Sequence, residues 1–279
     1  MTRSTVQESE EIELSLLLEA INMKYGYDFR DYSRTHIKRR VLNWMNCLRL
    51  NSISEIQYKI LYDRKFFHSL LPEFSIGVTE MFRDPSFYKA FREKLIPVLK
   101  TYPYIRIWHA GCSTGEEVYS MAMLLKEEGL YERSQIYATD FNVKSLEEAK
   151  DGIYPADYIR KYTYNYQQAG GKAAFSDYYL AKYNSVAFDE ALKKKITFAE
   201  HNLVTDGVFG EMHVIICRNV LIYFNRSLQR RVINLFSDSL SNGCFLCLGS
   251  KETLKFSEGT DNFEEFIGSE KIYRKKYIF

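Results

Sequence analysis

The stretch WHAGCSTGEEVYS, residues 108–120, decides the fold of this chain. It follows an extended apolar segment, IRIW at 105–108, and runs into the helical pattern VYSMAMLLKEEG. A strand, a tight glycine turn and a helix N-terminus therefore come in that order. This order is the local geometry of a nucleotide-type binding site.

The acidic character of the turn argues against a phosphate ligand. Phosphate loops combine the free N–H groups of a helix N-terminus with Lys or Arg, whereas this turn carries Glu116 and Glu117 and no cation. Two carboxylates suit a ligand that has hydroxyls to donate and a positive centre, and an adenosyl sulfonium has both. The alternative is that both glutamates are first-turn acids favoured only by the helix dipole, and the turn alone leaves this open.

Length and composition bound the class of protein. The 279 residues suffice for one large domain or two small ones. A net charge of +2 and a pI near 8.1 do not demand nucleic acid or a membrane surface. Apolar runs stay well short of the roughly 20 residues that cross a bilayer, and MTRSTVQESEEIE is unlike a signal peptide. We therefore expect a cytoplasmic protein without membrane insertion.

The five cysteines, an odd number without a secretory context, predict reduced thiols. Cys244 and Cys247 have the C-x-x-C spacing, but positions i and i+3 of a strand point to opposite faces. We expect no metal or redox site.

Helical periodicity dominates residues 10–100 and predicts an N-terminal helical domain over residues 1–95. Apolar side chains recur at helical spacing in two stretches: Leu14, Leu17, Leu18 and Ile21, and then Ile37, Val41, Trp44 and Leu48.

Beyond Thr101 short apolar runs alternate with helical patterns. The runs predict strands at 105–110, 135–139, 196–200, 213–217, 244–249 and 272–279, with helices after the first, second, fourth and fifth. Such alternation predicts an α/β domain over 96–279 with a doubly wound, mainly parallel sheet, whose ligands bind beyond the C-terminal strand ends. The last run alternates apolar and charged residues and is predicted to be an antiparallel edge strand.

The interval 152–195 breaks this rhythm. It contains the turn signal AGG at 169–171 and aromatic pieces such as FSDYYLAKYNSVAF. It is too long for an ordinary connection and too aromatic to be disordered, so we predict an inserted small antiparallel β subdomain.

Polar residues follow several predicted strands. Asp140 ends the second strand, about 25 residues after the glycine turn, where an acid accepts both ribose hydroxyls of an adenosine; a turn-capping Asp is the alternative. Asn202 and Leu203 are placed to hold an adenine edge and face, although Asn202 is as plausible as a turn residue. The run CRNVLIYF at 217–224 brings Arg218, Asn219 and Tyr223 to the same edge of the sheet.

Five ordered motifs together resemble the CheR-type chemotaxis receptor methyltransferases, from about residue 12 to the end of the chain. They are TEMFRD (79–84), AGCSTGEEVYS (110–120), ATDFN (138–142), HNL (201–203) and CRNVLIYF (217–224). The resemblance implies an S-adenosylmethionine-dependent enzyme that methylates glutamate side chains of chemoreceptors and releases S-adenosylhomocysteine. It also implies that the helical domain closes over the cofactor and that the β subdomain helps to dock the receptor.

The resemblance assigns roles residue by residue. It implies cofactor-binding roles for Thr79, Arg83, Glu117, Asp140, Asn202, Leu203, Arg218 and Asn219, and catalytic roles for Arg83 and Tyr223. We expect Arg83 to orient charged groups and Tyr223 to shape the methyl-transfer channel. Two departures from the family pattern are Gly77, where an Asn is common, and Val118, where a Pro is common in GEEP.

A predicted helix from Ser33 to Leu50 places Arg34, Lys38 and Arg49 in one narrow stripe. A solvated basic face is the alternative, and the resemblance favours docking of an acidic receptor helix. Other functions stay open at this point: a methyltransferase for RNA or a small molecule, or a non-catalytic sensor of the cofactor or its product. A nicotinamide oxidoreductase is poorly supported because the chain lacks G-x-G-x-x-G.

Overall fold

A computed structural model describes residues 3–74, 79–254 and 260–277. The chain divides into two compact units, one within Met1–Ile76 plus Ile222–Arg231 and the other within Gly77–Leu221 plus Val232–Phe279. Compactness does not define domains, so the division at residue 95 stays a prediction. Gly77 lies outside the described residues.

The first unit is helical, as predicted. Its helices are α1 (Arg3–Tyr25), α2 (Arg34–Cys47), α3 (Ile53–Tyr62) and α4 (Arg64–Phe74). The predicted apolar stripe of α1 is buried in full, because Leu14, Leu17, Leu18 and Ile21 are at most 1% exposed. None of the described helices is both long and apolar enough to cross a bilayer.

Helix α2 is shorter than the sequence predicted. Ile37 and Val41 are buried, but Trp44 is only partly buried and Leu48 is 40% exposed. The helix ends in a Schellman-type turn, in which Arg49 has a φ of 56° and the N–H of the next residue returns to the carbonyl of Met45 at 3.0 Å. Arg49 therefore lies beyond the helix and is not part of its basic stripe.

The second unit contains a seven-stranded sheet in the order β6-β2-β1-β7-β8-β10-β9. Its strands are β1 (Ile105–Ala110), β2 (Ser134–Asp140), β6 (Ile196–Glu200), β7 (Met212–Cys217), β8 (Leu240–Leu248), β9 (Phe263–Ile267) and β10 (Ile272–Lys275). β1 is parallel to β2 and β7, and β7 is parallel to β8. The strand order reverses between β1 and β7, and ligands bind at such switch points.

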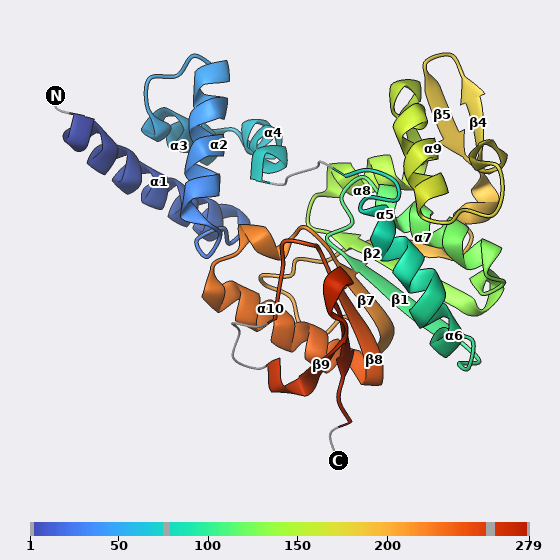
Figure 1. Ribbon diagram of the computed structural model, residues 1–279. Coiled ribbons are helices and arrows are strands. Elements are labelled where there is room, and N and C mark those ends of the chain that lie inside the picture. Colours follow the sequence, from blue (N-terminus) through green and yellow to red (C-terminus); the bar gives the residue numbers. More distant parts are fainter. Residues whose placement is uncertain (1–2, 75–78, 255–259, 278–279) are drawn as a thin grey trace. The chain divides into compact units, whose positions relative to one another are not determined.

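Helices cover both faces of the sheet, which confirms the predicted doubly wound arrangement. They are α5 (Pro85–Ala90), α6 (Ile96–Leu99), α7 (Glu116–Glu127), α8 (Val143–Asp151) and α10 (Arg226–Ser239). Figure 1 shows α5, α6 and α7 apart from α10 across the sheet. Alternate side chains of β1 face opposite layers: Ile107 joins the core formed with α5, α6 and α7, whereas Trp108 packs against Phe236 of α10.

The end of the sheet differs from the prediction in two respects. The described residues after β8, 249–254 and 260–262, contain turns and a 3-10 helix (Thr260–Asn262) but no α-helix, while residues 255–259 lie outside the described residues, and the chain forms the additional strand β9. β10 is antiparallel, as predicted, but it pairs with β8 on one side and β9 on the other, so β9 is the edge strand. The charged residues Glu264 and Glu265 lie exposed on this edge, which discourages pairing with another chain.

The insertion forms a separate three-stranded antiparallel sheet, which confirms the predicted β subdomain. Its strands β3 (Ile153–Pro155), β4 (Tyr179–Lys182) and β5 (Ser185–Phe188) run in the order β3-β5-β4. It also contains α9 (Ile159–Gln168), which the sequence analysis missed. Tyr162 and Tyr166 are buried one turn apart on α9, and aromatic residues at that spacing were interpreted as strand residues.

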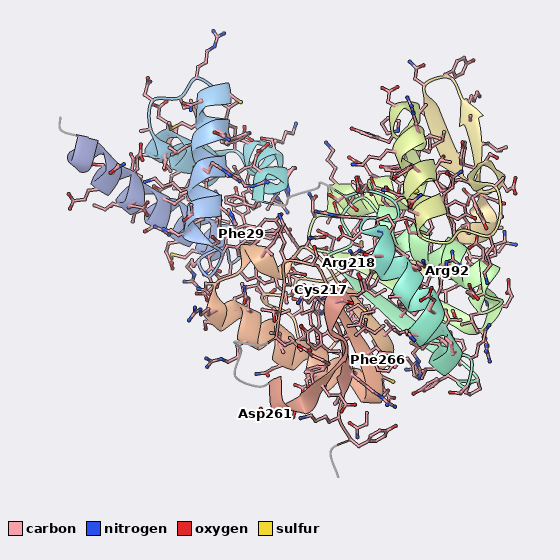
Figure 2. All side chains as sticks on the ribbon, in the orientation of Figure 1. Phe29, Arg92, Cys217, Arg218, Asp261 and Phe266 are labelled. Carbon is pink, nitrogen blue, oxygen red and sulfur yellow. The ribbon has the colours of Figure 1, made fainter. Side chains whose placement is uncertain are left out.

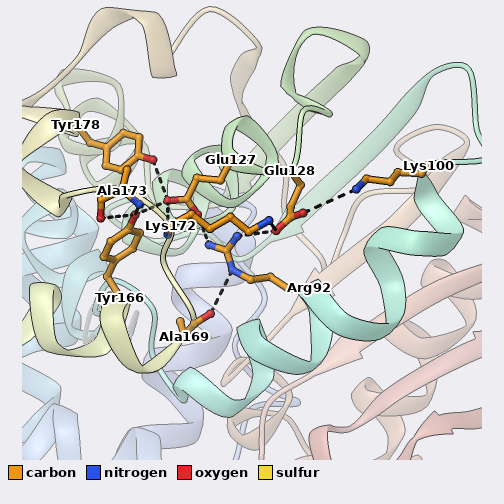
Figure 3. A network of polar contacts seen from close by, with 9 residues as sticks. All are labelled: Arg92, Lys100, Glu127, Glu128, Tyr166, Ala169, Lys172, Ala173 and Tyr178. Atoms are coloured by element: carbon orange, nitrogen blue, oxygen red, sulfur yellow. Dashed lines mark hydrogen bonds and ion pairs between the residues drawn. The ribbon is translucent and has the colours of Figure 1, made fainter.

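A buried polar network fastens this insertion to the rest of the second unit (Figure 3). Arg92 forms ion pairs with Glu127 and Glu128 at the end of α7 and donates to the carbonyl of Ala169 at 3.2 Å. Glu127 also accepts from the hydroxyls of Tyr166 and Tyr178, two residues of the insertion. The side chains of Arg92, Glu127 and Glu128 are each less than 10% exposed.

Charge compensation keeps Glu128 of this network ionised. Burial would raise the pKa of Glu128, but Lys172 and Arg92 hold that pKa below its usual value. The stabilisation is therefore present above the pKa that Glu128 has in the unfolded chain, and it is lost as the pH falls through the lowered pKa of the folded protein.

We expect Arg92→Leu to destabilise the protein by about 3–5 kcal/mol, because it leaves two buried carboxylates without their shared cation. Urea denaturation followed by circular dichroism measures this loss. Lys100→Ala is the matched control: its exposed ammonium lies 3.9 Å from the same Glu128, and we expect a loss below about 1 kcal/mol. Equal losses in the two variants would show that the buried network adds nothing beyond a surface ion pair.

Candidate functional site

The turn between β1 and α7 depends on glycine at two positions. Gly111 has a φ of 78°, and a Cβ there would lie 2.7 Å from Cγ2 of Val220. Gly115 has a φ of 90°, and its Cβ would lie 2.8 Å from that of Ala149. The N–H groups of residues 111 and 112 both donate to the carbonyl of Thr139, at 2.8 and 2.9 Å. The turn is thereby held against the end of β2.

Asp140, the last residue of β2, is buried against this turn. Its Oδ2 accepts from the N–H of Ser113 and its Oδ1 from that of Asn142, both at 2.9 Å. Burial raises the pKa of Asp140 above its usual value, although these backbone donors act in the opposite direction. A carboxylate offers about four acceptor positions, so Asp140 retains acceptor capacity for the hydroxyls of a ligand.

A second acidic residue, Glu117, lies in the first turn of α7 and contacts two basic side chains. Its Oε1 is 3.3 Å from Nδ1 of His109 in β1, and its Oε2 accepts from Nη1 of Arg218 at 2.8 Å. Burial would raise the pKa of Glu117, but His109 and Arg218 together hold that pKa below its usual value. Glu117 is therefore ionised at neutral pH.

Arg218 follows β7 directly and binds the segment that leads into α5 (Figure 2 labels Arg218 next to Cys217). Its Nη2 lies 2.7 Å from Oδ2 of Asp84, and its Nη1 donates to the carbonyl of Arg83 at 3.2 Å. The guanidinium also lies over the ring of Phe87, 4.3 Å from its centroid. Burial would lower the pKa of Arg218, but the charges of Glu117 and Asp84 contribute to raising it.

These four side chains, Arg218, Glu117, His109 and Asp84, are called the Arg218 cluster below. The Arg218 side chain is only 1% exposed, and both of its terminal nitrogens are engaged within the cluster. Its geometry is that of a residue that joins the end of β7, the start of α7 and the TEMFRD segment.

Glu116, the other acid of the turn, is turned into the protein. Its side chain accepts from the hydroxyl of Thr114 at 2.7 Å, and burial raises its pKa. Burial raises the pKa of the Cys112 thiol well above its usual value, and the charges of Asp140, Glu117 and Glu116 add to the shift. Glu116 and Glu117 begin α7 directly after the glycine turn, and Asp140 ends the strand that this turn contacts.

The turn after β6 is held to the same edge of the sheet. The N–H of His201 donates to the carbonyl of Asp140 at 3.2 Å. Asn202 uses its side-chain oxygen locally, where it accepts from the N–H of Val204 at 3.0 Å. Asn202 thus has the contact of a turn residue, the alternative that the sequence left open. Leu203 is 7% exposed, and both residues stay predictions as adenine contacts.

Asn219 follows Arg218 in a left-handed conformation with a φ of 62°. Its N–H and that of Val220 donate to the buried carboxylate of Glu252, at 3.0 and 2.9 Å. The ends of β7 and β8 are thereby joined, because Glu252 follows β8 by a few residues.

The other predicted residues lie elsewhere. Thr79 is half-buried at the start of a described segment. Tyr223 belongs to the first unit, where its carbonyl accepts from the N–H of Ser33 at 2.7 Å. On the same unit Arg34 pairs with Glu11, and Lys38 pairs with Glu10 and Glu11. The basic stripe of α2 is therefore partly neutralised by α1.

Three residues of the site were missed by the sequence analysis. His109 had a signal, because strand alternation places it on the same face as Ile107, toward α7. Asp84 precedes a proline at the first position of α5 and is typical of a helix cap, which concealed its contact with Arg218. Glu252 had no local signal for its contact with the end of β7, since Asn219 and Val220 are more than 30 residues away along the chain.

The acidic side chains of the site fit a cationic ligand that carries hydroxyls. The strand ends present the carboxylates Asp140 and Glu117 beside a glycine turn that carries no Lys or Arg, in contrast to phosphate-binding turns. Among the described residues, no group of three or more His, Cys, Asp or Glu side chains is arranged to hold a metal ion.

Comparisons with known proteins agree with this arrangement. Residues 77–272 match the model of the CheR methyltransferase, SAM-binding domain, and residues 12–75 match that of the CheR methyltransferase, all-alpha domain. The chain is 49% identical over 271 residues to "Putative methyltransferase Cher3" of Pseudomonas putida, covering 97% of this chain and 99% of that protein. It is 28% identical to a chemotaxis protein methyltransferase of Borreliella burgdorferi, covering 90% of each, and 28% identical to one of Vibrio anguillarum, covering 95% of each.

We expect Arg218→Lys to destabilise the protein by about 1–3 kcal/mol, because a single ammonium cannot replace the planar fork that joins Glu117 and Asp84. Urea denaturation measures the change. Arg160→Lys, at an exposed position of α9, is the control, with an expected change within about 0.5 kcal/mol. An unchanged stability in Arg218→Lys would contradict the joining role of the guanidinium.

Proposed function

Because the chain belongs to the CheR methyltransferase family, we propose that it methylates glutamate side-chain carboxylates of a chemoreceptor or a related signalling protein in the cytoplasm. The observation that carries this proposal is the match to both family models, the SAM-binding domain and the all-alpha domain, over residues 12–75 and 77–272. Two of the relatives named above are chemotaxis protein methyltransferases.

The cofactor is S-adenosylmethionine, which supplies an electrophilic methyl group on a positively charged sulfur. We assign its binding to the strand-end site described above. Asp140 has acceptor capacity for ribose hydroxyls, and the ionised Glu117 favours a positive charge nearby. Thr79, Arg83, Asn202, Leu203, Arg218 and Asn219 complete the proposed set, with Arg218 acting mainly by holding Glu117 and the Arg83 segment in place.

A carboxylate acceptor makes a modest demand on the enzyme. A glutamate side chain has a reference pKa of about 4.3 and is ionised at neutral pH, so it needs no general base. The chain has to orient the two reactants and exclude water, and orientation alone lowers a barrier by up to roughly 7–11 kcal/mol. We propose that Arg83 and Tyr223 take part in this orientation.

Methyl esterification suits a signalling role. Each ester removes one negative charge from a receptor helix, and a small change in free energy shifts an equilibrium between two signalling states. We propose that the basic side chains of the first unit, Arg34, Lys38 and Arg49, attract such an acidic helix. The ion pairs of Lys38 with Glu10 and Glu11 imply that the attraction is moderate.

The first experiment tests the acceptor. The purified protein is incubated with methyl-labelled S-adenosylmethionine and a membrane fraction that contains chemoreceptors, and the labelled protein is then treated with mild base. We expect protein-bound label that is released as methanol, because carboxyl methyl esters are base-labile. The Asp140→Asn variant is the control for label that does not depend on the cofactor site.

Each other outcome identifies a different function. Base-stable label would contradict glutamate esterification and indicate a nitrogen or another acceptor. Label in RNA or in a small molecule would assign a different substrate class. Cofactor binding without any label in a receptor-rich fraction would favour a non-catalytic sensor over the proposed enzyme.

A second experiment tests docking by charge. We expect Lys38→Gln to raise KM for the protein substrate severalfold at low salt, with a smaller effect as salt screens the attraction. The affinity for S-adenosylhomocysteine should not change. Lys65→Gln, at an exposed position of α4, makes the same charge change elsewhere on the first unit, and an equal effect of the two variants would contradict docking at α2.

A further inference from the structure

The buried carboxylate of Glu252 bridges the C-terminal ends of two neighbouring parallel strands. Its Oε2 accepts from the N–H of Gly249, which follows β8, at 2.6 Å, and from the N–H of Asn219, which follows β7, at 3.0 Å. Its Oε1 accepts from the N–H of Val220 at 2.9 Å. Glu252 is only 4% exposed, so these hydrogen bonds are shielded from water and are strong ones between a charged acceptor and backbone donors.

This carboxylate binds a loop in the left-handed backbone conformation, which among non-glycine residues Asn adopts most readily. Asn219 has a φ of 62°, in the left-handed region, and its N–H must point toward Glu252 for the bond to form. The fit is close as well: a Cβ on Gly249 would lie 2.8 Å both from the backbone nitrogen of Asn219 and from Oε2 of Glu252. The loop that carries Arg218 and Asn219 is therefore fixed from the β8 side.

The contacts continue from this loop across the edge of the sheet. Val220, held by Oε1 of Glu252, fills the space that a side chain on Gly111 would need, 2.7 Å from the ideal Cβ position. Gly111 begins the glycine turn and donates to the end of β2. The contacts that begin at the carboxylate of Glu252 thus connect the ends of β8, β7, β1 and β2.

We propose that Glu252 is a positioning residue for S-adenosylmethionine: it sets the backbone of residues 218–220 and, through Val220, the glycine turn. The proposal rests on the assignment of the cofactor to the strand-end site. Glu252 itself is buried behind the loop, and its effect on the ligand is exerted through the backbone groups that it binds.

The test is Glu252→Gln, which preserves the size of the side chain but replaces one acceptor oxygen with an NH₂ group that faces backbone donors. We expect the dissociation constant for S-adenosylhomocysteine, measured by titration calorimetry, to rise roughly ten- to a hundredfold, the effect of small displacements in a positioned site. KM for S-adenosylmethionine should rise in parallel, and KM for the protein substrate should not.

Glu127→Gln is the matched control. Glu127 is equally buried and also has several donors, from Arg92, Tyr178 and the N–H of Lys172, but it lies at the C-terminal end of α7 (Figure 3). We expect both variants to lower Tm and only Glu252→Gln to weaken ligand binding. If the two variants lose stability alike and bind S-adenosylhomocysteine like the unmodified protein, Glu252 has no positioning role.

A milder variant decides the question if Glu252→Gln does not fold. Val220→Ala removes the contact with the glycine turn from a partly exposed position, and a severalfold higher dissociation constant would support the proposal, whereas an unchanged one would overturn it. Calorimetry with S-adenosylhomocysteine does not depend on the methyl acceptor. An unmodified protein that binds this ligand but esterifies no receptor would refute the proposed function and leave the role of Glu252 testable.

Discussion

Parallel pairing of β1 with β2 on one side and with β7 on the other is the constraint on which the site depends. Parallel strands end at one edge of a sheet, so the residues that follow β1, β2, β7 and β8 meet there although the chain separates them widely. The glycine turn, Asp140, Arg218 and Glu252 acquire their contacts from this arrangement. Each of them has at least one partner that lies after a different strand or in the first turn of the helix that follows one.

Collecting acids at one buried edge is costly unless their charges are compensated. The protein does this in two ways. Glu117 has an ionic partner in Arg218, whereas Asp140 and Glu252 accept hydrogen bonds from backbone N–H groups. The raised pKa of Asp140 indicates that backbone donors offset its burial only in part, and this residual cost is consistent with a position kept for ligand binding.

The sequence predicted the elements whose signals are local. β1 and β6 agree with their predicted bounds because each is a short apolar run between turns, and the apolar stripe of α1 follows the helical period. The prediction was wrong for α9, where aromatic residues typical of strands lie at helical spacing. It was also wrong for Arg49, because a turn ends α2 before this residue although the helical spacing of apolar residues continues. Two of the four residues of the Arg218 cluster, Glu117 and Arg218, were predicted because they belong to motifs. The other two, His109 and Asp84, are recognised only by the contacts that they make in the folded protein. Glu252 shows the same limit, since no sequence pattern around it identifies its two distant backbone donors, the N–H groups of Asn219 and Val220.

The hydrogen bonds of the ionisable side chains at the site are relevant to the kind of methyl acceptor that the site suits. An amine or hydroxyl acceptor requires a group that removes its proton, and histidine serves most often. Each of the two histidines at these strand ends has one ring nitrogen engaged: Nδ1 of His109 contacts Glu117, and Nε2 of His201 lies 3.1 Å from the carbonyl of Gly207. Glu117 is ionised but lies within hydrogen-bonding distance of two basic side chains, which lowers its ability to take up a proton. Under the proposed function no such base is required, because the acceptor arrives ionised: among protein side chains a carboxylate meets that condition at neutral pH.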